Sequence, residues 1–311
     1  MRFIFLIYDS RSGSTYLSKK IYERFSEALV TPEINLCPAI KIMRNAKPTW
    51  SILARKLDEG RFFSSLGLSR DAMEKYYDLK SPFPLANFLD HAFFDYASKR
   101  GKPDTKVIVI KKGDHFKVVE QIIRLIPGVK FIFLRRDPRG IYESKKRTKR
   151  PYRPRETMAW GGVLAAAIRW IQYERFVEKV AFQNRVHIVS FEELGQNEER
   201  VLQDIGGFLT VTKRNVFRSE YKIADMEERI HAKAVLPVVN RSEINAWRKK
   251  LSKFELLVIE TILRKRMGFV GYEPTTRGGI ICFVVIPIAV LDMIIKILAT
   301  FIVRLWGRVI N

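Results

Sequence analysis

Cysteine is scarce in this chain, and the signals typical of secreted proteins are missing from it. The two cysteines, Cys37 and Cys282, lie far apart and offer no framework for a set of disulfides, which favours a reducing compartment. The apolar run at the amino terminus, Phe3–Tyr8, is shorter than the core of a cleavable signal and leads directly into a polar turn. No cleavable signal is therefore expected.

Acidic residues are also few, since 33 Asp and Glu face 56 Lys and Arg, and the formal net charge is +23. This charge requires an anionic partner, which could be nucleic acid, acidic lipid or a multiply charged small molecule. Helix-turn-helix, zinc and RNA-binding signatures are absent, so no nucleic-acid partner is expected. Seven basic residues gather in KKRTKRPYRPR, residues 145–155. This basic strip is either a solvated loop or the rim of a site or membrane-facing patch.

Apolar, β-branched segments alternate with helical ones along the chain. The expected strands are Phe3–Tyr8, Lys106–Ile110, Lys130–Leu134 and Val186–Ser190. The expected helices are Ser14–Leu29, Phe116–Leu125, one from about Ile141, Trp160–Ala181 and Asn197–Leu209. Residues 32–100 mix short helical pieces with turns. No internal repeat or low-complexity linker interrupts the pattern. It predicts an α/β fold with three layers, a mainly parallel sheet flanked by helices.

Three loops with cationic or phosphate-cradling groups follow the expected strands. They are DSRSGST after the first, KKGD after KVIVI, and RRDPRG after KFIFL. Parallel strands bring such loops together at one edge of the sheet, where ligands of these folds bind. DSRSGST has the strand–turn–helix layout of a phosphate loop but lacks the lysine of GxxxxGK[ST]. Taken alone, it could also be an ordinary turn into a capped helix.

Four segments resemble the sulfotransferases. RSGSTYL looks like their 5′-phosphosulfate loop, and FIFLRRDPRGIYESK looks like their 3′-phosphate motif, with Arg136 and Ser144 in the expected order. VSFEEL with the helix ending in GGFL, and NAWRKKLSKFELLVIE with GYEP, match two later family segments. Tyrosylprotein-type and related bacterial enzymes are the most similar. The resemblance implies a sulfotransferase domain over residues 1–275, with 34–100 as a variable acceptor-side insertion. Residues 276–311 are expected to form a separate membrane-associated segment, for a reason given below.

The resemblance implies the donor 3′-phosphoadenosine 5′-phosphosulfate (PAPS), the product PAP, and no metal. Backbone N–H groups of Ser12, Gly13, Ser14 and Thr15 would face the 5′-phosphate at a helix amino terminus. Arg11 would bind the phosphosulfate oxygens and take part in catalysis. Arg136 and Ser144 would bind the 3′-phosphate, although Arg136 could instead pair with Asp137 or Glu143. Asp137 and Pro138 are expected to start a helix.

Two residues are expected to carry the chemistry. Glu33, in TPEINLCP, is the predicted base for the acceptor hydroxyl, by similarity to the tyrosylprotein enzymes; a carboxylate at a turn is the alternative. Lys111 is the predicted group at the leaving phosphate, with Lys112 as the adjacent alternative or the pair as solvated lysines.

Two further donor contacts are expected from the family pattern. Phe191 replaces a tyrosine found in many relatives and can still pack on the adenine. Arg241 is expected to contact a phosphate from the loop at 231–241. Trp247 is expected in the core.

The segment 280–303 is almost wholly apolar and meets the length of a membrane span, ~20 residues. However, Asp292, Lys296, Thr300, Arg304 and Arg308 recur every four residues, a polar stripe that suits a helix lying in the membrane interface. Spanning and interfacial helices are the two membrane alternatives, and a buried helix of the domain is the third. The expected location is membrane-associated, with the catalytic domain in the cytoplasm, as at a bacterial inner membrane.

The acceptor is left open. A hydroxyl or amine of a glycan, a lipid-linked group or a protein would serve, and charge alone favours an acidic or extended glycan. Two rival functions are a P-loop kinase, which the missing lysine disfavours, and a membrane scaffold that has lost catalysis. Against lost catalysis, the chain keeps Arg11, Glu33, Lys111, Arg136 and Ser144 together.

Overall fold

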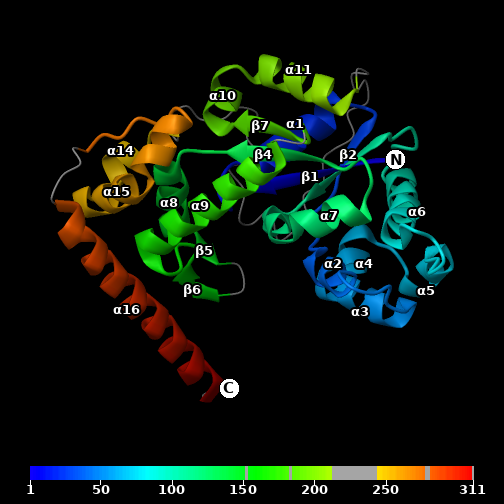
Figure 1. Cartoon of the computed structure of the whole chain (residues 1–311), viewed down its shortest axis with the longest axis horizontal. Coiled ribbons are helices and arrows are strands. Elements are labelled where there is room, and N and C mark those ends of the chain that lie inside the picture. The colour runs from blue at the N-terminus through cyan, green and yellow to red at the C-terminus, as the bar shows by residue number, and fades with distance from the viewer. Residues whose placement is uncertain (151–152, 182–183, 212–243, 277–280, 310–311) are drawn as a thin grey trace. The chain divides into compact units, whose positions relative to one another are not determined.

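The computed structural model describes residues 1–150, 153–181, 184–211, 244–276 and 281–309 (Figure 1). These residues divide into two compact units. Among the described residues, the sheet unit comprises 1–8, 13–135 and those from 176 to 211, and the helical unit comprises 9–12, those from 136 to 175 and those from 244 to 309. The predicted division at residue 275 differs from this one and stays a prediction.

A five-stranded parallel sheet forms the centre of the sheet unit. Its strands are β1 (Arg2–Tyr8), β2 (Ala28–Val30), β3 (Val107–Lys111), β4 (Lys130–Arg135) and β7 (Val186–Ser190). Their order is β2-β3-β1-β4-β7, with β1 between β3 and β4 (Figure 1). β1 after Arg2, β3 before Lys111 and the middle of β4 are buried and apolar, as expected for strands covered on both faces. The predicted α/β fold with a parallel sheet is confirmed.

Helices connect these strands, as parallel pairing requires. Those of the sheet unit are α1 (Ser14–Arg24), α2 (Cys37–Ile42), α3 (Trp50–Glu59), α4 (Phe62–Leu66), α5 (Arg70–Met73), η1 (Glu74–Tyr76), α6 (Pro84–Lys99), η2 (Gly113–Val118), α7 (Val119–Leu125), α10 (Phe191–Gln196) and α11 (Glu198–Leu209). The helix predicted over Ser14–Leu29 was wrong in its second half. It ends at Arg24, and Ala28–Val30 pairs with β3 as an edge strand.

The helical unit contains α8 (Pro138–Arg147), β5 (Lys149–Arg150), β6 (Arg153–Thr157), α14 (Trp247–Lys250), α15 (Lys253–Phe269) and α16 (Ile281–Val309). The helix α9 (Gly162–Ala181) belongs to this unit as far as Arg175. The apolar core of the helical unit contains Trp170, Trp247, Leu263 and Val285. Trp247 is 2% exposed, which confirms its predicted place in the core.

One face of α16 packs on this core through Val285 and Ala289, while a row of apolar side chains on the helix is exposed. The exposed row is Val284, Ile288, Leu291, Ile295 and Leu298. Asp292 and Lys296 form an ion pair of 2.7 Å beside Gly162, where a Cβ would lie 2.9 Å from Asp292 Oδ2. These two residues of the polar stripe therefore lie against the protein.

Among the residues that the structure describes, no helix is long and apolar enough to cross a membrane. The spanning alternative for 280–303 has no support from this finding. The buried-helix alternative fits only the face that carries Val285 and Ala289.

Candidate active site

The loop after β1 begins in the helical unit with Asp9–Ser12. Ser12 N–H donates to the Asp9 carbonyl at 3.1 Å, and Arg11 has a left-handed φ of 73°. A buried ion pair of 2.6 Å joins Asp9 Oδ2 to Lys145 Nζ of α8, and both side chains are 4% exposed. The Ser12 hydroxyl is fully buried and has no hydrogen-bond partner among the described residues. The loop is thus anchored to α8 while it retains a polar atom without a partner.

The same loop continues into the sheet unit at Gly13, which precedes α1. Gly13 has a φ of 94°, and a Cβ there would overlap the ring of Phe191. No side chain caps α1, so the first-turn N–H groups, including those of Ser14 and Thr15, lack the partners that a cap would provide. Such groups are a ready anion site. Ser12 N–H donates to the Asp9 carbonyl in this structure, and its predicted contact with the 5′-phosphate stays a prediction.

Arg136 and Ser144, the predicted 3′-phosphate residues, both contact Arg11 within the helical unit. Arg136 Nη1 donates to the Arg11 carbonyl at 2.7 Å, and Arg11 Nε donates to Ser144 Oγ at 3.1 Å. A Cβ at Gly140 would lie 3.2 Å from Arg136 Nε, so glycine leaves room for the guanidinium. The Arg11 side chain therefore lies on the predicted 3′-phosphate serine rather than apart from it.

Asp137 begins α8, as predicted. Its side chain accepts from Arg139 N at 2.9 Å, and Pro138 occupies the first helical turn. The Asp137 carboxylate also forms an ion pair of 2.7 Å with the Arg139 guanidinium, which pairs with Glu260 as well. Asp137 thus has a structural partner in Arg139.

A second cluster lies in the sheet unit, at the ends of β1 and β3. Lys111 is fully buried, and its Nζ donates to Thr15 Oγ1 at 3.3 Å. Lys112 Nζ lies 3.1 Å from Glu33 Oε2, and the Tyr8 hydroxyl donates to Glu33 Oε1 at 2.5 Å. The two adjacent lysines therefore differ in partner: Lys111 contacts Thr15 at the start of α1, and Lys112 contacts the Glu33 carboxylate.

The charge of Glu33 follows from these contacts. Burial alone would raise the pKa of Glu33, but the cations of Lys112 and Lys111 and the Tyr8 hydroxyl bond lower it to about 2. Glu33 is consequently an ionised carboxylate at neutral pH. A carboxylate with this pKa takes up a proton only when its cationic neighbours are engaged elsewhere.

His115 is buried near this cluster and has a structural role. Its Nε2 accepts from Leu36 N at 2.9 Å, and its ring meets Phe5 edge-on. Burial, followed by the charge of Lys112, lowers the pKa of His115 to about 3, so the ring is neutral. It fixes the start of the 34–100 region beside β1.

Some predicted residues lie elsewhere, and some neighbours were not predicted. Arg241 lies outside the described residues. Within the basic strip, Lys145 is buried, which departs from the prediction of a solvated loop at that residue. Asp9 and Tyr8 were missed, although their place at the end of an apolar strand is a signal that could have identified them. The described residues contain no group of three or more His, Cys, Asp or Glu arranged for a metal ion.

Comparison with known proteins identifies the family. Residues 4–214 match the model of the sulfotransferase family. A search of curated proteins found no match. The structure resembles the sulfotransferase domain from the curacin biosynthetic pathway, with 16% identity, a TM-score of 0.54, and coverage of 88% of this chain and 99% of that one. It also resembles the sulfotransferase domain of the Synechococcus PCC 7002 olefin synthase, with 16% identity, a TM-score of 0.51, and coverage of 84% and 94%.

Proposed function

The chain belongs to the sulfotransferase family, and we propose that it transfers the sulfuryl group of PAPS to a hydroxyl of an acceptor. Enzymes of this family use PAPS as the donor. The observation that carries the proposal is the loop from Asp9 to Thr15, which joins a buried strand to an uncapped helix and contains no lysine.

The residues of this loop fit a phosphosulfate. The Ser12 hydroxyl is buried without a partner among the described residues, which is the state of a group that awaits a ligand. N–H groups of Ser14 and Thr15 at the start of α1 would donate to the 5′-phosphate. The Phe191 ring lies against Gly13, so it is held beside the loop, where the adenine would pack on it.

Arg136 and Ser144 would bind the 3′-phosphate. Arg11 already contacts both of these residues, so its guanidinium lies beside the proposed 3′-phosphate pair, from where it would bind the phosphosulfate. Arg136 is 7% exposed, so its contact with a phosphate would be shielded from water and strong. Arg241 would add a contact from the loop at 231–241, by similarity to the family.

Sulfuryl transfer requires loss of the acceptor proton and stabilisation of the leaving phosphate oxygen. Lys111 suits the second task, because its ammonium group is buried and contacts Thr15 of the phosphate loop. Glu33 suits the first, provided that Lys112 turns from Glu33 to the anionic donor and thereby raises the pKa of the carboxylate. The proton of the hydroxyl then passes to Glu33, and the S–O bond to the phosphate breaks as the new O–S bond forms.

We also propose that the protein associates with the membrane interface through α16, with the catalytic residues on the cytoplasmic side. The exposed apolar row of the helix and the net charge of +23 support this proposal. The proposal predicts that the protein sediments with anionic vesicles and that high salt releases part of it from them. No sedimentation in low salt would refute it.

Calorimetry with PAP and AMP tests the donor assignment. Arg136→Ala should lose about 1.5–3 kcal/mol of PAP binding, because a charge-assisted contact is removed, and should bind PAP and AMP alike. Arg55→Ala is the control, since it removes an exposed arginine of α3. If Arg136→Ala still prefers PAP by the wild-type margin, the 3′-phosphate assignment is wrong. Transfer of label from PAPS to fractionated acceptors tests the reaction itself.

A further inference from the structure

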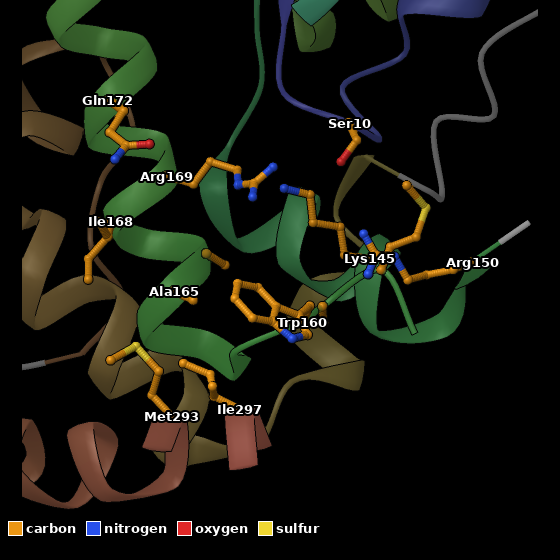
Figure 2. A pocket seen from close by; sticks show the side chains of 13 residues that line it. Ser10, Lys145, Arg150, Trp160, Ala165, Ile168, Arg169, Gln172, Met293 and Ile297 are labelled. Atoms are coloured by element: carbon orange, nitrogen blue, oxygen red, sulfur yellow. The ribbon is translucent and has the colours of Figure 1, made fainter. Parts of the chain in front are cut away.

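The helical unit contains a cavity of about 320 Å³ that the donor assignments do not use (Figure 2). This volume lies at the lower end of the range for small-molecule sites, ~300–1,000 Å³. Its lining comes from the loop after β1, from α8 and β5, from residues 158–160 between β6 and α9, and from α9 and α16. The cavity is therefore built from segments that are far apart in the sequence.

One end of the cavity is cationic. The side chains of Arg169 of α9 and Lys145 of α8 end near one another and near Ser10, and Arg150 lies close by (Figure 2). Lys145 is bound to Asp9, and Arg150 to Glu156 at 3.2 Å. None of the described residues pairs with the Arg169 guanidinium, which is therefore available to an anion in the cavity.

The other end is apolar. Trp160 lies there with Met293 and Ile297 of α16 and with Ala165 of α9 (Figure 2). The indole is 41% exposed, so it presents a face to a bound molecule. A ligand that fills the cavity must therefore be charged or polar at one end and apolar at the other.

The cationic end adjoins residues assigned to the donor. Ser10 directly precedes Arg11, and Lys145 directly follows Ser144. Arg11 and Ser144 belong to the helical unit as well, and the Arg11 side chain donates to Ser144. A headgroup bound at Ser10 and Arg169 lies beside the arginine expected to hold the phosphosulfate.

We propose that this cavity is the acceptor site and that the acceptor is a membrane amphiphile whose anionic headgroup carries a hydroxyl. This inference rests on the proposed sulfuryl transfer. Arg169 pairs with the anionic group, while the first methylenes of the tail pack on Trp160, Met293 and Ile297. The cavity is too small for a long chain, so the rest of the tail continues along the exposed apolar side chains of α16, such as Ile294 and Leu298.

The reaction at this site is balanced without any further reagent. The headgroup hydroxyl oxygen forms a bond to sulfur, and the bond from sulfur to the phosphate oxygen of the donor breaks. The hydroxyl proton goes to the base, PAP leaves with the electron pair of the broken bond, and the product is a sulfate ester on the headgroup.

Binding of lauroyl-lysophosphatidylglycerol to the full-length protein, measured by calorimetry below its micelle concentration, tests the inference. This probe has a phosphate, free hydroxyls and one acyl chain. Glycerol phosphate and dodecyl maltoside are the matched probes, because each lacks one of its two recognised ends. We expect the lysolipid to bind at least ~10-fold more tightly than either, since both an ion pair and apolar burial contribute.

Variants then locate the site. Arg169→Gln and Ile297→Ser should each weaken lysolipid binding by ~10-fold or more. Arg175→Gln on α9 and Ile286→Ser on α16 are the controls, because these exposed residues lie on the same helices and do not line the cavity. Equal affinity for the lysolipid and glycerol phosphate would overturn the inference. Equal affinities of the cavity variants and their controls would overturn it as well.

PAP binding to the same variants separates this inference from the proposed function. Arg169→Gln should bind PAP like the wild type. If the wild type fails to bind PAP, the proposed function fails, and the cavity loses its role as an acceptor site. If PAP binds and the lysolipid does not, only the amphiphile is refuted.

Discussion

Replacing Lys112 by Gln should raise the pKa of Glu33 toward its ordinary value. The Lys112 ammonium lies 3.1 Å from Glu33 Oε2 and is the foremost of the groups that lower this pKa to about 2. An opposite charge at such a distance lowers the pKa of a carboxylic acid by about 1–3 units. We therefore expect Lys112→Gln to raise the pKa of Glu33 by ~1 unit or more, and Lys112→Arg to leave it low.

Carbon-13 NMR of glutamate side-chain carboxyls measures this shift, and Glu33→Gln identifies the resonance by its loss. The direction of this change in the pKa of Glu33 also predicts how turnover depends on pH. If Glu33 is the base, it must be ionised to accept a proton, so the acidic limb of the kcat/KM profile, which reports the free enzyme, should lie at a higher pH in Lys112→Gln than in the wild type. A pKa that stays near 2 in Lys112→Gln would refute the ion pair as its cause.

Turnover distinguishes the base from a merely structural carboxylate. Glu33→Gln should lower kcat by about 10²–10⁴-fold if Glu33 is the base, and PAP affinity should change little. Wild-type kcat in this variant would remove Glu33 from the mechanism, and the shifted pKa would then report only an ion pair.

Two further predictions concern stability. Asp9→Asn should lower the free energy of unfolding in urea by about 3–5 kcal/mol, because it leaves the Lys145 ammonium buried and unpaired. The double variant Asp9→Asn with Lys145→Met should recover much of this loss. An equal loss in the single and the double variant would contradict the explanation. Glu260 is fully buried, and although burial opposes its charge, bonds from Thr276, Thr275 and Arg139 lower its pKa to about 2. Its folded pKa lies below the ordinary value of 4.5, so its contribution is present above that pH and is lost as pH falls toward 2. Glu260→Gln should therefore show a shallower fall of unfolding free energy across this range than the wild type, and an unchanged slope would refute this.

The strands that carry the site could be predicted because each is an unbroken apolar run ended by charge or glycine. KVIVI and KFIFL can hardly be anything but buried strands, and the loops after them follow directly. β2 could not be predicted in this way. Its three residues, Ala28–Val30, are too few to show a period, and their strand conformation comes from pairing with β3.

The partners of the charged residues were harder to predict than their positions. Lys145 belongs to a segment with seven basic residues in eleven positions, 145–155, and such a composition predicts exposure to solvent. Its side chain is nevertheless buried, paired with Asp9, which lies 136 residues away in the sequence. The recurrence of Asp292 and Lys296 on one face of α16 was identified from the sequence, but which surface that face meets depends on Gly162. Such contacts depend on tertiary structure, and a local sequence pattern does not predict them.

The position of α16 after all five sheet strands in the sequence has a consequence for synthesis. Every strand of the five-stranded sheet has left the ribosome once Ser190 has emerged, whereas the apolar wall of the cavity waits for Met293 and Ile297. Domains generally fold as their segments emerge, amino-terminal parts first. The nascent protein can therefore form its sheet and the loop after β1 before the cavity has its apolar wall. If the cavity is the acceptor site, donor binding can precede acceptor binding during synthesis.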